Sequence, residues 1–408
     1  MRNVKAPEGW TYRPLSDLAD VQTGIAKGKE VNGSAVSLPY LRVANVQDGH
    51  VDLSTIKEIL VSSSEVDRYS LQANDVLFTE GGDFDKLGRG TVWYGQIQPC
   101  LHQNHIFAVR PHPNQLVPEF LAYQASSDYG RRYFQLSSKQ STNLASINST
   151  QLKAFPVLSP PLPEQLKITR VLQTWDRALA IYERLIAAKQ VRANAFSRQC
   201  FEPCHPTSKT RPSNWLRYEL GDVFKERDEP GLNDDKLLSI TMSGGVIDRE
   251  ESGRKDTSNE DKSAYKLILP GDIGYNTMRM WQGVCGLSRL RGIVSPAYTI
   301  VTPDNRGIAA RYAAHLFKSR RMVFDFERYS QGLTSDTWNL KFPAFRKIVV
   351  YLPPIDVQRR QAELFDTLFA EIAALEKQRE AVAKQKRGLM QKLLTGEWRV
   401  NANAEVAA

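Results

Sequence analysis

The sequence predicts an α+β protein in which two globular domains are separated by a pair of long antiparallel coiled-coil helices, built as an internal pseudo-twofold repeat. Two observations predict this fold class. One stretch carries apolar residues at alternating steps of four and three, and a second stretch 193 residues later repeats it position for position. An apolar repeat of period 3.5 needs a second helix to cover it. Two such stretches in one chain of 408 residues can cover each other.

The first apolar seam lies between Pro163 and Cys200. Pro163 suits the first turn of a helix, where its missing N–H is not needed, and Glu164 suits the positive end of the helix dipole. Lys189 is the one charged residue among the seam positions. These positions are Ile168, Leu172, Trp175, Leu179, Tyr182, Ile186, Lys189, Ala193, Phe196 and Cys200.

The second seam matches the first from Leu172 onward at the fixed offset. The lead-ins also match, since SPPLPEQ (Ser159 to Gln165) corresponds to LPPIDVQ (Leu352 to Gln358). One seam alone would be typical of an amphipathic core helix, but two at a fixed offset indicate a duplication and an antiparallel helix pair. The repeat is too long for a solenoid. The second seam consists of Phe365, Leu368, Ile372, Leu375, Arg379, Val382, Lys386, Leu389 and Leu393.

The segments before each seam also correspond, and each is predicted to be a mixed globule of strands, turns and a helical segment. Trp10 to Leu18 (WTYRPLSDL) opens the first half and Trp215 to Val223 (WLRYELGDV) the second, each with Leu five and Asp seven residues after the Trp. Period-2 alternation in the stretches that follow predicts strands. The matching stretches are ANDVLFTEGG with LPGDIGYNTMRMW, QNHIFAVRP with SPAYTIVTP, and the polar loops SSKQSTN with SQGLTSD.

We therefore divide the chain into five segments. The stretch FEPCHPTSKTRPSN, rich in Pro, Ser and Thr, ends the first helix and separates the two halves. The tail NANAEVAA is expected to be flexible. The segments are a first globular domain at 1–158, a first spacer helix at 159–205, a second globular domain at 206–351, a second spacer helix at 352–396 and the tail at 397–408.

Charge and composition limit the class of partner and the compartment. The net charge of +9 and the pI of about 9.2 point to a polyanion or an acidic partner. No apolar run approaches the length of a membrane span, and the start MRNVKAPEGW lacks the apolar core of a signal peptide. Four cysteines in this length form no disulfide framework, so we expect a reducing cytoplasm.

Motifs for catalysis are weak. The Pro-Pro pairs SPPL and LPPI are not the aromatic loop of an amino-methyltransferase, and GIAKGK is one residue short of a phosphate loop. Asp248 with Glu260 and Lys262 has the loose spacing of a metal-dependent nuclease, but the run is polar and is expected to be a loop. Two clusters could suggest zinc without the paired CxxC spacing of a strong site. They are Cys100, His102 and His105, and Cys200, Cys204 and His205.

Several of these stretches together resemble the specificity subunits of type I restriction–modification enzymes, over essentially the whole chain. The most telling are PPLPEQ, the ending KRGLMQKLLTGEWRV, EGGDFDKLGRG (Glu80 to Gly90) and GGVIDREESGRKDTSNED. The resemblance implies that the two globules are target-recognition domains and that the subunit reads double-stranded DNA without doing chemistry. It also implies two methyltransferase subunits as partners, restriction/translocase subunits for cleavage, and no cofactor of the chain's own, S-adenosylmethionine being used by the methyltransferases.

Candidate site residues follow from this reading. Base edges are read by Arg, Lys, Asn, Gln or His on exposed loops. In the first domain the candidates are Lys86, Arg89, Gln103, Asn104, His105, Lys139, Gln140, Thr142 and Asn143; in the second they are Arg254, Lys255, Arg279, Trp281, Gln282 and Tyr298. The resemblance points to Pro163, Glu164, Gln165 and Gln358 for partner binding, although the second lead-in, PPIDVQ, lacks the Glu found at Glu164.

Helix length predicts the form of the target. A helix of about 38 residues is about 57 Å long, more than one DNA turn of roughly 34 Å. Two domains of different sequence held that far apart would read an asymmetric, bipartite target with unread bases between its halves. The alternative is a coiled-coil assembly protein whose globules bind something other than DNA.

Overall fold

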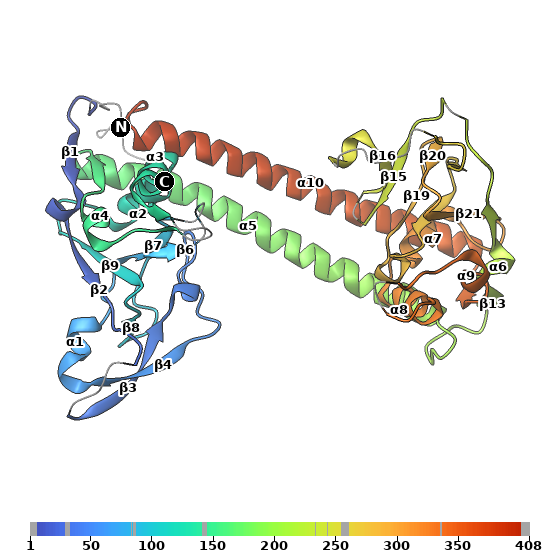
Figure 1. The fold of residues 1–408 in the computed structure, drawn as a ribbon, viewed down its shortest axis with the longest axis horizontal. Helices are drawn as coiled ribbons and strands as arrows, with labels where there is room; N and C mark the ends of the chain where they lie inside the picture. Colours follow the sequence, from blue (N-terminus) through green and yellow to red (C-terminus); the bar gives the residue numbers. More distant parts are fainter. Residues whose placement is uncertain are drawn as a thin grey trace. The chain divides into compact units, whose positions relative to one another are not determined.

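The computed structural model describes residues 6–28, 33–82, 84, 87–140, 145–232, 234–242, 244–253, 261–334 and 337–400, with the backbone alone described at Gln140 and Ser252. The chain divides into two compact units. Unit 1 comprises Met1–Tyr182 and Gln378–Ala408, and unit 2 comprises Glu183–Lys377. Two 40-residue helices, α5 (Leu162–Phe201) and α10 (Ile355–Leu394), contribute to both units (Figure 1).

Unit 1 is built around a four-stranded antiparallel sheet with the order β2-β9-β5-β7 and a three-stranded sheet with the order β4-β3-β8. In the second sheet β3 and β8 are parallel. The strands of these two sheets are β2 (Ala19–Thr23), β3 (Ala35–Leu41), β4 (Lys57–Ser62), β5 (Val76–Thr79), β7 (Gly90–Val92), β8 (Leu101–His102) and β9 (Ile106–Pro111).

Shorter strands and helices complete unit 1. β1 pairs with β12 before α5, and β10, β11 and β6 form a small sheet. These strands are β1 (Thr11–Pro14), β6 (Gly81–Gly82), β10 (Lys139–Gln140), β11 (Ala145–Ser146) and β12 (Pro156–Ser159). The helices are α1 (Val66–Tyr69), α2 (Pro118–Ser126), α3 (Asp128–Ser137) and α4 (Ser149–Lys153), with 3-10 turns η1 (Leu15–Asp17), η2 (Val43–Asn45) and η3 (Ser63–Glu65).

Local sequence explains where the helices of unit 1 begin. Pro118 occupies the first turn of α2, and the Ser127 side chain accepts a hydrogen bond from Gly130 N at the start of α3. Asn148 and Gln151 form a capping box at α4. These helices bury aromatic rings against the sheet, and Phe134 stacks on Phe155 with ring centroids 5.0 Å apart.

Unit 2 repeats the plan. Its four-stranded antiparallel sheet has the order β14-β21-β18-β19, and β13 pairs with β22 before α10. Two further two-stranded sheets pair β15 with β16 and β17 with β20. The strands are β13 (Leu216–Glu219), β14 (Phe224–Arg227), β15 (Leu238–Thr241), β16 (Gly245–Asp248), β17 (Lys266–Ile268), β18 (Ile273–Asn276), β19 (Cys285–Leu287), β20 (Gly292–Val294), β21 (Tyr298–Pro303) and β22 (Val349–Leu352).

The helices of unit 2 follow the same order as those of unit 1. They are α6 (Leu220–Val223), α7 (Ala310–Leu316), α8 (Arg320–Tyr329) and α9 (Phe342–Phe345), with 3-10 turns η5 (Glu202–Cys204), η6 (Glu250–Ser252) and η7 (Met280–Gln282). The α2–α3 pair thus corresponds to α7–α8, and α4 corresponds to α9. Helix α10 begins and ends 193 residues after α5, as the matched seams predict. The predicted fold class, two sheet-rich domains linked by a coiled coil, is confirmed.

The two long helices pair antiparallel within each unit. In unit 2, Ile186 and Ala193 of α5 are buried against Ile372 of α10, and the rings of Phe196 and Phe365 lie 4.6 Å apart. In unit 1, Ile168 and Leu172 join the main core together with Met390 and Leu393. All of these residues except Met390 are predicted seam positions, so the seams cover each other as expected.

The charged residue in the first seam has its own counter-charge. Lys189 Nζ lies 2.6 Å from Glu371 Oε2 at the edge of the helix pair in unit 2. Its long side chain can lie along the apolar seam while the ammonium group reaches the carboxylate. Lys189 therefore fits into the helix pair without interrupting the apolar seam.

All four cysteines are free and buried. None of the helices in the described parts of the chain has the length and apolarity that crossing a membrane requires.

Candidate functional site

Three polar stretches that are far apart in the sequence meet at one edge of unit 1. Strand β6 pairs with β11, which in turn pairs with β10, so Lys139 and Gln140 lie close to Gly81 and Gly82. Directly before β6, the backbone N–H of Glu80 donates to the carbonyl of His105 at 2.9 Å. The carbonyl of Arg89 accepts from Thr79 N at 3.2 Å. The structure therefore brings together residues from three of the predicted stretches.

Their exposure differs. His105 and Lys139 are exposed, and Nδ1 of the His105 imidazole is hydrogen-bonded to the Glu80 carboxylate. Gln103 and Asn104 are half-buried and are held by backbone hydrogen bonds from Gln103 N to Leu41 O (2.9 Å) and from Asn104 N to Ile25 O (3.0 Å). These bonds fix the backbone of the segment and leave its side-chain amides available to a ligand.

Arg89 is more constrained. It is half-buried, and its Nη1 donates to Gln47 Oε1 at 3.2 Å. Its Nε is buried without a hydrogen-bond partner among the described residues. Because a guanidinium carries five N–H donors, Arg89 has donors left for a ligand oxygen.

Five of the predicted residues lie outside the described part of the chain, and at a sixth the side chain does. The five are Lys86, Thr142, Asn143, Arg254 and Lys255. The sixth is Gln140, which has a described backbone in β10. Their roles stay predictions.

In unit 2 the predicted residues gather after β18. Arg279 and Gln282 are exposed, and Trp281 between them is half-buried, with its Nε1 donating to Met278 O at 3.0 Å. Tyr298 lies on the adjoining strand β21, opposite Asn276, and packs against the small core of β15 to β20. Three of the four described candidates in unit 2 therefore form one loop surface, and Tyr298 is part of the sheet beneath it.

A further loop in unit 2 joins this surface. The sequence analysis matched its stretch SQGLTSD with SSKQSTN of unit 1 but named no candidate residue in it. Leu340 N donates to Thr277 O at 2.8 Å, which repeats the bond from Ile147 N to Glu80 O (2.7 Å) in unit 1. The loop before Leu340 therefore takes the place that the β10–β11 loop has in unit 1. Its Trp338 packs edge to face on Trp281, with ring centroids 5.4 Å apart. The fixed offset of 193 residues could have found it, because it carries Lys139–Ser146 onto 332–339.

The two glutamines proposed for partner binding are buried and hydrogen-bonded within the chain. The side chain of Gln165 is fully buried, accepts from Val117 N (2.9 Å) and donates to the carbonyls of Gln115 and Pro160 (both 3.0 Å). Gln358, at the equivalent position, does the same with Ala309 N, Gly307 O and Pro353 O, all at 2.9 Å. Each glutamine fastens the start of a long helix to its own globule.

Glu164 is likewise occupied within the chain. Its side chain is 3% exposed and receives Arg399 Nε at 2.8 Å, Arg399 Nη2 at 2.9 Å and Trp10 Nε1 at 3.3 Å. The hydrogen bond to Glu164 raises the pKa of Arg399. Of the four residues proposed for partner binding, Pro163 alone is exposed.

The missing Glu of the second lead-in now has a structural account. The offset of 193 residues places Val357 at the position of Glu164 and relates Pro206 to Arg399. Both members of the ion pair are therefore absent from unit 2 together. A buried carboxylate without its counter-charge would be costly, so the pair is present or absent as a whole.

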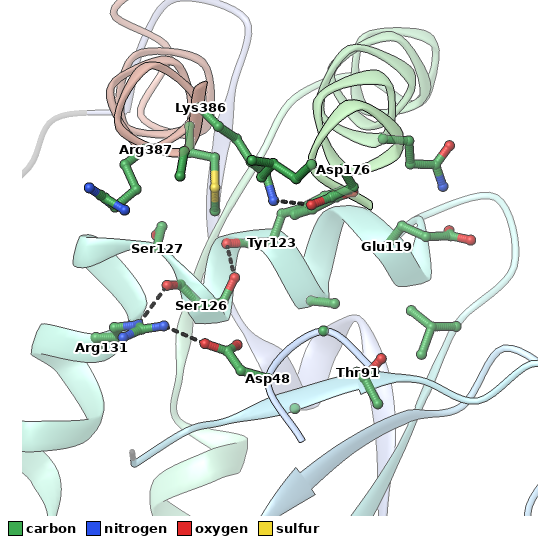
Figure 2. Close-up of a pocket in the computed structure, with 18 of the residues that line it drawn as sticks. Asp48, Thr91, Glu119, Tyr123, Ser126, Ser127, Arg131, Asp176, Lys386 and Arg387 are labelled. Carbon is green, nitrogen blue, oxygen red and sulfur yellow. Dashed lines mark hydrogen bonds and ion pairs between the residues drawn. The ribbon is translucent and has the colours of Figure 1, made fainter. Parts of the chain in front are cut away.

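Unit 1 also contains a groove of about 720 Å³ between β7, α2, α3 and the helix pair (Figure 2). Asp176 of α5 accepts from Tyr123 Oη at 2.6 Å and pairs with Lys386 of α10. Arg131 pairs with Asp48 at 2.6 Å. Burial and then Asp176 raise the pKa of Tyr123 well above its ordinary value. Because acidic and basic side chains line it together, the groove does not favour a polyanion.

The two cysteine–histidine clusters have other partners. Burial raises the pKa of the Cys100 thiol to about 12 and lowers that of His102 to about 4. Cys204 Sγ lies 3.3 Å from Tyr312 Oη, and His205 lies 3.4 Å from Asp325. In the described ranges no group of His, Cys, Asp and Glu could hold a metal ion. Asp248 pairs with Lys236, and Glu260 lies outside those ranges.

Comparisons with known proteins agree on one family. Residues 7–188 match the family model described as "Type I restriction modification DNA specificity domain". A Methanocaldococcus jannaschii protein assigned as the MjaX type I restriction enzyme specificity subunit is 24% identical over 97% of this chain and 95% of its own.

Two solved structures share the fold. The type I restriction–modification S subunit of M. genitalium has a TM-score of 0.58 at 16% identity, covering 96% of this chain and 97% of its own. A chain from a structural study of complex assembly and conformational transition in the type I R-M system has a TM-score of 0.59 at 15% identity, covering 97% of this chain and 100% of its own.

Proposed function

The chain belongs to the family of type I restriction-enzyme specificity subunits, and on that premise we propose that it is the non-catalytic, sequence-reading subunit of a DNA methyltransferase and restriction complex. Residues 1–158 would read one half of a bipartite DNA target and residues 206–351 the other. The long helices would set the gap of unread bases between the halves.

One observation carries this proposal. The same fold occurs twice in one chain, and the loops at the equivalent edge differ in chemistry. In unit 1 this edge offers Lys139 and His105, whereas in unit 2 it offers Arg279, Trp281 and Gln282. A duplicated scaffold with unlike loops suits the reading of two different half-sites, because loops on a rigid framework carry the specificity. An assembly protein without a nucleic-acid ligand would have no need of this difference.

The DNA-reading residues are proposed in two groups. The first group consists of the exposed candidates at the two loop edges, which we propose for base contacts: His105, Lys139, Arg279 and Gln282. The second group is the rest of the predicted set, which stays part of the proposal. Phosphate contacts from the chain's excess of lysine and arginine would supply much of the affinity. Binding to duplex DNA should therefore weaken steeply as salt concentration rises.

We propose two methyltransferase subunits and restriction/translocase subunits as partners. The helix pair offers them apolar side chains that its own seam does not cover. In unit 2, Leu185, Val191, Leu364 and Phe369 are 41–66% exposed on α5 and α10, and burying such side chains stabilises association. We propose two methyltransferase copies because the scaffold itself is repeated, one globule and one long helix in each half.

Methyl transfer would take place on the partners, which use S-adenosylmethionine; the chain would need no cofactor of its own. We place the complex in the cytoplasm, where its DNA substrate is. The purified chain alone should transfer no methyl group to DNA, and transfer by the chain without its partners would contradict the proposal.

Domain exchange tests the reading function. Residues 1–158 are replaced by the first domain of another family member, and the methylated sequence is mapped in cells that carry the chain with its methyltransferase partner. We expect one half of the methylated sequence to change and the other half and the gap to persist. A change in both halves, or in neither, would overturn the assignment of one half-site to each domain.

A further inference from the structure

The reading surface of unit 2 carries two large apolar side chains that its own fold does not use. Leu333 is 101% exposed and Met278 is 50% exposed. Both belong to the two loops that meet beside Trp281, since Met278 O accepts from Trp281 Nε1 at 3.0 Å and Trp338 packs on the Trp281 ring. Burial of either side chain would stabilise a complex, so they are available to a ligand.

The loop that carries Leu333 is held firmly at its base. Gln331 and Asn339 exchange backbone hydrogen bonds, both at 2.9 Å, and Leu340 N donates to Thr277 O. Leu333 lies in the turn between Gln331 and Asn339. Because Leu333 is fully exposed, its apolar side chain does not stabilise the fold of the described chain. A turn that only faces solvent would be expected to carry a polar residue there.

The corresponding edge of unit 1 offers a polar side chain. Unit 1 pairs Lys139 with Ser146 where unit 2 pairs Gln331 with Asn339, so Leu333, two residues after Gln331, corresponds to a position of unit 1 outside the described residues. Lys139 is exposed at this edge of unit 1, and lysine can hydrogen-bond to base edges whereas leucine cannot.

The chemistry of the major groove indicates what an apolar side chain would read there. Among the four base pairs, the thymine C5-methyl is the apolar group that the major groove displays. The neighbouring Arg279 is exposed and supplies a positive charge for the phosphates or a guanine edge. Resting on the proposed function, we infer that unit 2 recognises thymine methyl groups in its half-site through Leu333 and Met278.

The test uses the complex of the full chain with its methyltransferase partner and a duplex carrying the mapped target. Thymines of one half-site at a time are replaced by deoxyuridine, which lacks the methyl group and keeps the base pairing. Substitution in the half-site of unit 2 should weaken binding about tenfold, in line with the discrimination of a good base contact. The same replacement in the half-site of unit 1 should weaken binding less.

Variants assign the effect to the loop. Leu333→Gln, which replaces the apolar side chain with a polar one, should lose most of the preference for the thymine duplex over the deoxyuridine duplex. Leu333 is fully exposed, so the change should leave folding intact. Leu216→Ala is the matched control, because Leu216 is a 61% exposed leucine of the same unit on β13; it should retain the tenfold preference for thymine.

Three outcomes of the binding experiments would overturn the inference and leave the proposed function standing. They are a half-site for unit 2 without thymine, equal binding of both duplexes by the unaltered complex, and a preference that Leu333→Gln leaves unchanged. A rise in 2-aminopurine fluorescence at a step beside the half-site, abolished by Leu333→Gln, would instead show a wedge that unstacks bases and would also overturn it. Loss of all sequence preference would count against the proposed function itself.

Discussion

At the scale of single residues, buried polar side chains explain both the likeness of the two halves and their main difference. Gln165 and Gln358 occupy equivalent places and make equivalent bonds, and both were visible in the sequence as the last residue of each Pro-Pro lead-in. Their role was not visible, because a sequence pattern does not show whether a polar side chain points inward. The Glu164–Arg399 pair was hidden for another reason: its members lie 235 residues apart.

We expect the Glu164–Arg399 ion pair to stabilise unit 1 only when both charges are present. Arg399→Ala leaves a buried carboxylate with Trp10 as its remaining side-chain donor and should lower the free energy of unfolding by about 1–3 kcal/mol. Glu164→Val combined with Arg399→Ala should recover part of that loss, because it reproduces the uncharged arrangement of Val357 in unit 2. The measurement is urea unfolding of the purified chain.

Arg360→Ala is the matched control for the loss of an arginine. Its partner Asp356 lies four residues away on the surface of α10, with both side chains well exposed, so the change should stay within about 0.5 kcal/mol. A double variant less stable than Arg399→Ala alone would contradict the coupled account of the pair.

At the scale of elements, periodicity predicted the long helices well and the recognition loops poorly. The two seams predicted α5 and α10 because an amphipathic pattern sustained over many turns has few alternatives. The stretch GIAKGK, one residue short of a phosphate loop, has no role that its sequence reveals. In the structure Ile25 within it donates to His102 O (2.9 Å) and accepts from Asn104 N (3.0 Å), so it supports the Gln103–His105 segment. Backbone pairing between segments so far apart in the chain leaves no recognisable pattern in the local sequence of either segment.

Gly24 shows how tightly that support is built. A Cβ at Gly24 would lie 2.0 Å from the backbone carbonyl oxygen of His102. Gly24→Ala must therefore displace His102 and the Gln103–His105 segment. We expect a loss of about 2–4 kcal/mol in stability and weaker binding to the half-site of unit 1. Gly388→Ala serves as the control, because a Cβ there meets no atom within 4 Å and alanine favours a helix by up to about 1 kcal/mol. Equal stability of the two variants would show that Gly24 is not needed for close packing.

At the scale of the whole molecule, the helix pair should act as the ruler for the gap between half-sites. Asp176 pairs with Lys386 in unit 1, and Lys189 pairs with Glu371 in unit 2. The heptads Ala180–Ile186 and Ala373–Arg379 lie between these two cross-links, one on each helix. Deleting both heptads would keep the apolar seam in phase and both ion pairs possible, while each helix would lose seven residues between them.

Each helix should then shorten by about 10 Å at 1.5 Å per residue, or about three base pairs of B-DNA. Three base pairs also rotate one half-site by nearly a third of a turn, since a turn is about 10.5 base pairs. Binding to the original target should therefore weaken by about tenfold or more, and surviving activity should move to targets with a shorter gap and unchanged half-sites. A control that replaces the same heptads with others of equal length and equal apolar pattern should keep the original gap. If the shortened chain methylated the original target as before, the helices would not set the spacing, because no rigid helix pair can lose 10 Å and hold two domains over the same two stretches of duplex.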